Sequence, residues 1–168
     1  ASGKSEYAEQ LILRAGALPR YYVATMEPFG AEARARIARH RVLRAQKRFE
    51  TIECPVGLSR VLLPARGAAL LECLSNLAAN ELYSPAGAGG EQALAAVVDG
   101  VESLRRQCEA LVVVTGEVFS GGSAYAGDTG TYLRVLAAAN RALAARADAV
   151  CEVACGLPRY YKGEGAAL

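Results

Sequence analysis

The chain has 168 residues, the length of one domain with a substantial core, and 52% of them are hydrophobic against 21% charged, as in an ordinary globular protein. Its formal net charge of +2 is too small to indicate nucleic acid as a partner. No apolar run reaches the length of a membrane span, and no secretory signal is visible.

The chain begins with the end of a phosphate-binding loop pattern. Gly3, Lys4 and Ser5 match the last three positions of G-x-x-x-x-G-K-[ST], a loop that follows a β-strand. Because neither that strand nor the first glycine precedes them, we expect about ten further residues ahead of Ala1, enough for a strand and half a loop. Apolar residues recur at helical spacing over residues 4–15, which predicts a helix that opens at the loop.

This short match has two interpretations. As a phosphate site, the helix N-terminus would offer free N–H groups, Lys4 would reach the outer phosphates and the Ser5 hydroxyl would ligate Mg²⁺. As an ordinary helix start, Ser2 or Ser5 would be the N-cap and Lys4 would point into solvent. Glu72 favours the phosphate site, because an acidic residue that ends a second buried strand is what a P-loop enzyme needs to hold Mg²⁺.

Strands and helices alternate along the rest of the chain. The predicted strands cover residues 21–25, 49–53, 68–72, part of 110–117, 149–156 and, as an edge strand, 159–163. The predicted helices cover residues 31–46, 75–83, 91–109 and 131–146. Apolar strands that alternate with helices predict an α/β fold with a mostly parallel central sheet flanked by helices, similar to P-loop NTPases, in a single nucleotide-binding domain over residues 1–168.

Polar residues follow three of the predicted strands. Thr25, Glu72, Thr115 and Glu117 lie at or just beyond their carboxyl ends. In open α/β sheets the carboxyl ends meet at one edge, where ligands bind. We therefore expect these residues to gather beside the phosphate loop.

His40, the only histidine, lies in the very basic helix predicted over residues 31–46. Arg36 and Arg44 are four residues away on either side, so all three share one helix face. The two positive charges disfavour the imidazolium and leave the neutral, nucleophilic imidazole, while the guanidinium groups would bind a triphosphate. The pattern suits covalent nucleotidyl transfer through a phosphoramidate, and the alternative is a solvated basic face with an incidental histidine.

The cysteines argue against both a disulfide framework and a zinc site. Their number, five, is odd, and no C-x-x-C pair occurs. Cys151 and Cys155 fall in an apolar, strand-like run, which predicts buried free thiols. We therefore expect a reducing, cytoplasmic location.

Together these motifs resemble the bifunctional adenosylcobinamide kinase / adenosylcobinamide-phosphate guanylyltransferase family of cobalamin assembly. "SGKSEYAE" is similar to the end of the family's P-loop, and "RIARHRVLR" to its R-I-x-x-H-x-x-x-R signature, in which the histidine carries the guanylyl group. "YYVATMEPFG", "FETIECP", "LLECLSN" and "VVVTGEVFSGG" continue the resemblance in order, so that it covers nearly the whole chain.

The resemblance implies two reactions. The enzyme would phosphorylate adenosylcobinamide, and then transfer GMP from GTP through a guanylyl-histidine to adenosylcobinamide phosphate, which gives adenosylcobinamide-GDP. GTP, ATP and Mg²⁺ are the implied cofactors. A cytoplasmic homo-oligomer without a nucleic-acid partner or a membrane span is implied as well.

The same resemblance assigns the site residues. It implies His40 as the nucleophile and Ser5 and Glu72 as the metal site. The residues implied to bind the nucleotide are Ala1, Ser2, Gly3, Lys4, Ser5, Ala24, Thr25, Met26, Arg36, Arg41, Val42, Leu43, Arg44, Glu53 and Glu72. The chain departs from many members by Gly116 in place of asparagine and by Glu72 in place of aspartate.

Two other functions remain compatible with the residues alone. One is a simple P-loop small-molecule kinase in which His40 is structural. The other is a nucleotide-gated binding module whose basic helix docks an acidic partner or nucleic acid.

Overall fold

The computed structural model describes residues 2–27, 38, 46–116, 118 and 128–163. The helices of these ranges are α1 (Lys4–Ala15), α3 (Leu74–Tyr83), α4 (Ala93–Gln107) and α5 (Asp128–Arg146). The strands are β1 (Arg20–Ala24), β2 (Phe49–Glu53), β3 (Gly67–Glu72), β4 (Cys108–Val114), β5 (Val150–Ala154) and β6 (Leu157–Lys162). Short 3₁₀ turns cover Leu58–Arg60 and Gly90–Gln92.

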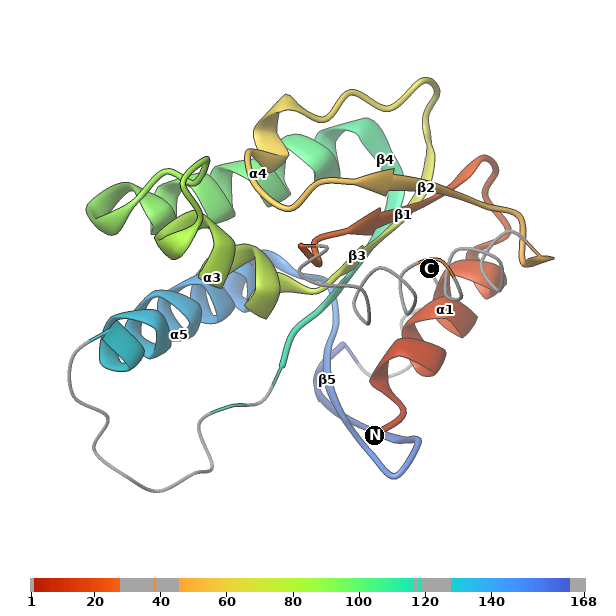
Figure 1. The fold of residues 1–168 in the computed structure, drawn as a ribbon. Coiled ribbons are helices and arrows are strands. Elements are labelled where there is room, and N and C mark those ends of the chain that lie inside the picture. The colour runs from red at the N-terminus through yellow and green to blue at the C-terminus, as the bar shows by residue number, and fades with distance from the viewer. Residues whose placement is uncertain (1, 28–37, 39–45, 117, 119–127, 164–168) are drawn as a thin grey trace.

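The first four strands form one sheet in the order β2-β1-β3-β4, and every pair in it is parallel. Strands β5 and β6 form a separate antiparallel hairpin. Figure 1 shows α1 on one side of the sheet and α3, α4 and α5 on the other. The predicted α/β class with a mostly parallel central sheet is thus confirmed.

Side chains that alternate along the strands divide the core in two. Tyr21 and Val23 of β1 pack toward α3, α4 and α5, in a cluster that includes Leu77, Val97 and Leu136. Tyr22 and Ala24 pack on the opposite face with Leu70 of β3, beneath Ala8 and Ile12 of α1. Successive residues of a strand point to opposite faces, and β1 is apolar and buried from Tyr21 to Ala24, so both of its faces are covered.

Most predicted elements are present with small shifts at their ends. The helix over residues 4–15 and the strand over 49–53 have the predicted bounds, and the expected edge strand is β6. The basic helix predicted over residues 31–46 lies outside the described residues, apart from Ala38 and Gln46. None of the helices in the described part of the chain combines the length and the apolar character that crossing a membrane would need.

The prediction that Cys155 is a buried strand residue is wrong. Strand β5 ends at Ala154, and Cys155 and Gly156 form the turn of the hairpin, both with positive φ (52° and 80°). Two positive φ angles are what a two-residue type I′ hairpin turn requires. Cys155 is therefore exposed, while Cys151 on β5 is half-buried.

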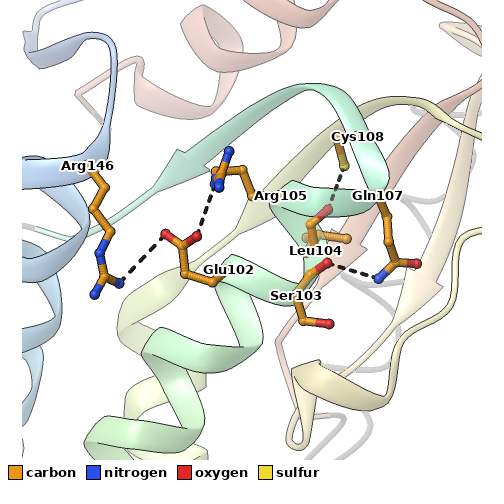
Figure 2. A network of polar contacts seen from close by, with 7 residues as sticks. All are labelled: Glu102, Ser103, Leu104, Arg105, Gln107, Cys108 and Arg146. Carbon is orange, nitrogen blue, oxygen red and sulfur yellow. Dashed lines mark hydrogen bonds and ion pairs between the residues drawn. The ribbon is translucent and has the colours of Figure 1, made fainter.

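The carboxyl end of α4 carries the polar contacts drawn in Figure 2. Glu102 accepts a hydrogen bond from Arg105 (3.0 Å) and lies 3.7 Å from Arg146, so it connects α4 to the last residue of α5. Gln107 donates to the Ser103 carbonyl oxygen (3.1 Å), and the Cys108 thiol donates to the Leu104 carbonyl oxygen (3.1 Å). These contacts hold the helix end at the start of β4 and are structural.

The thiols are expected to differ in reactivity. Burial raises the pKa of Cys108 to about 11, and it also raises the pKa of Cys54 and of Cys151. The reactive thiolate of Cys108 is therefore scarce near neutral pH, whereas Cys155 is exposed. We expect iodoacetamide to label Cys155 first and Cys108 only after unfolding, as read by peptide mass spectrometry. Equal labelling rates in the folded protein would contradict this burial.

Candidate functional site

Two glutamates end strands on either side of β1. In the parallel register, Ala24 at the end of β1 is paired with Glu53 of β2 and with Glu72 of β3. All three ends lie at the carboxyl edge of the sheet, where the sequence analysis expected Thr25 and Glu72. Glu53 is exposed, Glu72 is half-buried and Ala24 is buried.

The start of α1 reaches the same edge. Gly3 occupies the N-cap position with φ 83°, and its carbonyl oxygen accepts from Tyr7 N (3.0 Å). The Ser5 hydroxyl donates to Glu72 Oε1, although the two residues are 67 positions apart. Lys4 Nζ donates to Ser2 Oγ (3.1 Å). Neither Ser2 nor Ser5 is therefore the N-cap of α1. The Ser5 hydroxyl is hydrogen-bonded instead to the Glu72 carboxylate at the end of β3.

Glu72 has a second donor that the sequence analysis missed. The Tyr22 hydroxyl donates to Glu72 Oε2 at 2.5 Å. Strand alternation was the signal that could have indicated this contact. Tyr22 of β1 and Glu72 of β3 lie on the same face of the sheet, together with Ala24 and Leu70, and α1 covers that face.

A hydroxyl and a carboxylate beside a helix N-terminus suit Mg²⁺ that arrives with a triphosphate. This ion takes oxygen ligands and is usually held by one or two protein groups, phosphates and waters. Ser5 and Glu72 supply such groups, and their direct contact shows that both reach one point. Across the described residues, no group of three or more His, Cys, Asp or Glu side chains forms a metal site independent of a nucleotide.

Thr25, expected to line the nucleotide site, has a structural task. Its fully buried hydroxyl donates to the Cys73 carbonyl oxygen (2.8 Å) and accepts from Cys73 N (2.7 Å). The Thr25 backbone N–H also donates to the Glu72 carbonyl oxygen (3.0 Å). Thr25 thus holds the ends of β1 and β3 together beside the carboxylate.

We expect Thr25→Val to destabilise the fold by about 1–3 kcal/mol, because it leaves the N–H of half-buried Cys73 without its hydrogen-bond acceptor and the Cys73 carbonyl oxygen with only the Leu77 N–H. Thr51→Val, in a half-buried position of β2, is the matched control and should cost much less. Chemical denaturation measures both variants. If Thr25→Val lowers the free energy of unfolding no more than Thr51→Val does, the Thr25 hydroxyl does not stabilise the fold in this way.

Asn80 of α3 links the strand ends to the next layer. Its side-chain amide donates to the carbonyl oxygens of Thr25 (2.8 Å) and Pro55 (3.0 Å), just beyond β1 and β2. Glu27, after half-buried Met26, accepts from the Ser84 hydroxyl (2.8 Å). These contacts fix the chain where it leaves β1, and no sequence motif indicated them.

The last hairpin lies against the start of α1. Gly156 N donates to the Ser2 carbonyl oxygen (2.9 Å), and a Cβ atom on Gly3 would lie only 2.8 Å from Gly156 Cα. The hydroxyls of Tyr7 and Tyr160 share a hydrogen bond of 2.6 Å. Burial, and then this bond, raise the pKa of Tyr7 to about 12.

The residues expected to perform the covalent chemistry lie outside the described ranges. They are Ala1, Arg36, His40, Arg41, Val42, Leu43 and Arg44. Glu117 is also outside, whereas Thr115 and Gly116 follow β4 and bond to Asn140 (3.0 Å) and Ser75 (3.0 Å). The structure therefore brings Ser5, at the end of the loop pattern, into contact with Glu72, and the role of His40 stays a prediction.

Comparison with models of protein families assigns a family to this chain. A family model described as cobinamide kinase / cobinamide phosphate guanyltransferase matches residues 1–160. A search of the curated proteins finds no match. The matched span contains every residue that the sequence analysis assigned to the site.

Proposed function

The chain belongs to the cobinamide kinase / cobinamide phosphate guanyltransferase family, and from this premise we propose how its own residues perform the two reactions. As a member, it is a bifunctional kinase and guanylyltransferase of cobalamin biosynthesis. We assign adenosylcobinamide and its phosphate as acceptors, GTP and ATP as nucleotides, and a cytoplasmic homo-oligomer as the working form.

In the kinase step, residues 1–5 bind the triphosphate. The N–H groups at the start of α1 and the Lys4 ammonium would bind its oxygens, and Ser5 and Glu72 would hold Mg²⁺, which would neutralise phosphate charge. The aminopropanol hydroxyl of adenosylcobinamide bonds to the γ-phosphorus as the bond to the bridging oxygen breaks, and the hydroxyl proton leaves. The protein contributes positioning and charge, because no protein nucleophile is needed.

In the guanylyl step, His40 bonds to the α-phosphorus of GTP and pyrophosphate leaves. The phosphate of adenosylcobinamide phosphate then displaces the histidine and yields adenosylcobinamide-GDP. The two displacements replace one difficult step. The R-I-x-x-H-x-x-x-R signature at residues 36–44 and the family membership support this assignment.

The observation that carries the nucleotide site is the contact between Ser5 and Glu72. This contact brings the hydroxyl at the end of the loop pattern to the carboxylate at the end of β3. A P-loop enzyme needs these two groups to hold the Mg²⁺ of a bound triphosphate. Ala24, Thr25, Met26 and Glu53 are proposed to line the same edge of the sheet.

Labelled GTP tests the function as a whole. We expect label from the α-phosphate to remain on the denatured protein and to be released by mild acid, as a phosphoramidate would be, whereas label from the γ-phosphate is not retained. A simple kinase would retain neither and consume triphosphate only with its acceptor. A binding module would show no turnover at all.

A further inference from the structure

The hydroxyl of Tyr22 has no part in the assignments above. Tyr22 is only 4% exposed, in the apolar layer between β1 and α1, where a phenylalanine would fill nearly the same space. Its hydroxyl donates to Glu72 Oε2 at 2.5 Å. The Tyr22 hydroxyl is therefore a polar group in an apolar layer, and it is hydrogen-bonded to the Glu72 carboxylate of the proposed nucleotide site.

The sheet register explains how Tyr22 reaches the carboxylate. Tyr22 is paired with Leu70 of β3, and Glu72 is two residues further along β3 on the same face. Diagonal neighbours on adjacent strands lie within reach of an aromatic side chain. The ring also packs edge-on against Phe49 of β2, with centroids 6.1 Å apart and planes at 89°. Neighbouring strands thus fix both the position and the direction of the hydroxyl.

Within the part of the chain that the structure describes, Glu72 consequently has one hydroxyl donor on each oxygen. Ser5 occupies Oε1 from the α1 side and Tyr22 occupies Oε2 from the sheet side. Each carboxylate oxygen accepts about two hydrogen bonds, so a further direction at each oxygen is left for a cation. Ser5 is itself an expected ligand, which leaves Tyr22 as the donor that orients Glu72 from within the core.

We propose that Tyr22 is a positioning residue that holds the Glu72 carboxylate in its metal-binding orientation. The inference rests on the proposed function, since it concerns the same Mg²⁺–triphosphate site. Outer partners that hydrogen-bond a metal ligand fix its orientation, and their loss typically weakens metal affinity about 10- to 100-fold. Tyr22→Phe should therefore act on the metal dependence of nucleotide binding rather than on binding as a whole.

Tyr21 provides a matched control one residue away. It is 1% exposed and points to the opposite face, where its hydroxyl donates to the Ala65 carbonyl oxygen (3.0 Å) and accepts from Ala65 N (3.1 Å). Tyr21→Phe removes the same atom from the same strand without touching Glu72. It should lower the unfolding temperature and leave the metal dependence unchanged.

The test is titration calorimetry of a non-hydrolysable GTP analogue, with Mg²⁺ and with a chelator, on the full chain. We expect Tyr22→Phe to weaken the Mg²⁺-dependent part of the affinity about 10-fold and to leave metal-free affinity at the parent value. The inference is overturned if Tyr22→Phe keeps the parent's metal dependence, or loses affinity equally with and without the metal.

Glu72→Gln separates this inference from the proposed function. If Mg²⁺ enhances analogue binding equally in the parent and in Glu72→Gln, the proposed metal role of Glu72 fails. If Glu72→Gln loses the enhancement and Tyr22→Phe keeps it, only the Tyr22 inference fails. Adding Tyr22→Phe to Glu72→Gln should produce no further loss, because the hydroxyl acts through the carboxylate. A further loss in the double variant would show that Tyr22 acts by another route.

Discussion

The variant His40→Asn is expected to phosphorylate adenosylcobinamide at nearly the parent rate and to form no adenosylcobinamide-GDP. Asparagine is similar in size to histidine but has no nitrogen that forms a phosphoramidate. Loss of a covalent nucleophile in other enzymes costs up to about 10⁶-fold in rate, so the guanylyl step should fall below detection. The kinase step is spared because the substrate hydroxyl attacks the γ-phosphorus directly.

Both activities are measured in one preparation, by chromatography of the corrinoid products and by retention of α-labelled GMP on the protein. The kinase rate is then an internal control for folding and for nucleotide binding. Formation of adenosylcobinamide-GDP at the parent rate would remove His40 as the nucleophile. Loss of both activities with intact nucleotide binding would give the histidine a shared role, and the two-step scheme would need revision.

The variant Lys4→Ala is expected to lose kinase activity by about 10²- to 10³-fold, the usual cost of removing one group that stabilises charge in a transition state. Lys4 lies at the first residue of α1, one position before Ser5, and its ammonium reaches across the loop to Ser2. The side chain contributes little to the apolar core, so the free energy of unfolding should change by less than about 1 kcal/mol.

Lys162→Ala is the matched control for Lys4→Ala. Lys162 is an exposed lysine of β6 whose ammonium donates to the carbonyl oxygens of Ala144 and Ala145 near the end of α5. Its loss should slightly lower stability and leave phosphorylation unchanged. If the two variants reduce kinase activity equally, the effect of Lys4→Ala is not specific to the phosphate loop.

The sequence predicted those parts of the fold that local patterns determine. The helix over residues 4–15 was found with correct bounds because apolar spacing starts after the loop and Gly16 ends it, with φ 73°. The meeting of Ser5 with the end of β3 was anticipated because parallel strands share a carboxyl edge.

The contacts that sequence reasoning missed depend on strand order and register. Tyr22 reaches Glu72 only because β1 and β3 are neighbours in the order β2-β1-β3-β4. The spacing of residues along the sequence does not reveal which strands are neighbours in the sheet. Asn80 likewise bonds to the ends of two strands from a third element. Cys155 was misplaced because the apolar run continues past the strand end, where only Gly156 indicated a turn.

The contact between the last hairpin and the start of α1 couples the stability of the hairpin to ligand binding at residues 2–5. Gly156 N donates to the Ser2 carbonyl oxygen, and Gly3 lies so close to Gly156 that a Cβ atom at position 3 would not fit. A ligand that fixes residues 2–5 should therefore stabilise the folded hairpin. By the same coupling free energy, the folded hairpin should strengthen the binding of that ligand. Slower hydrogen exchange of the Gly156 amide on nucleotide binding would report this coupling from a position far along the chain from the phosphate loop.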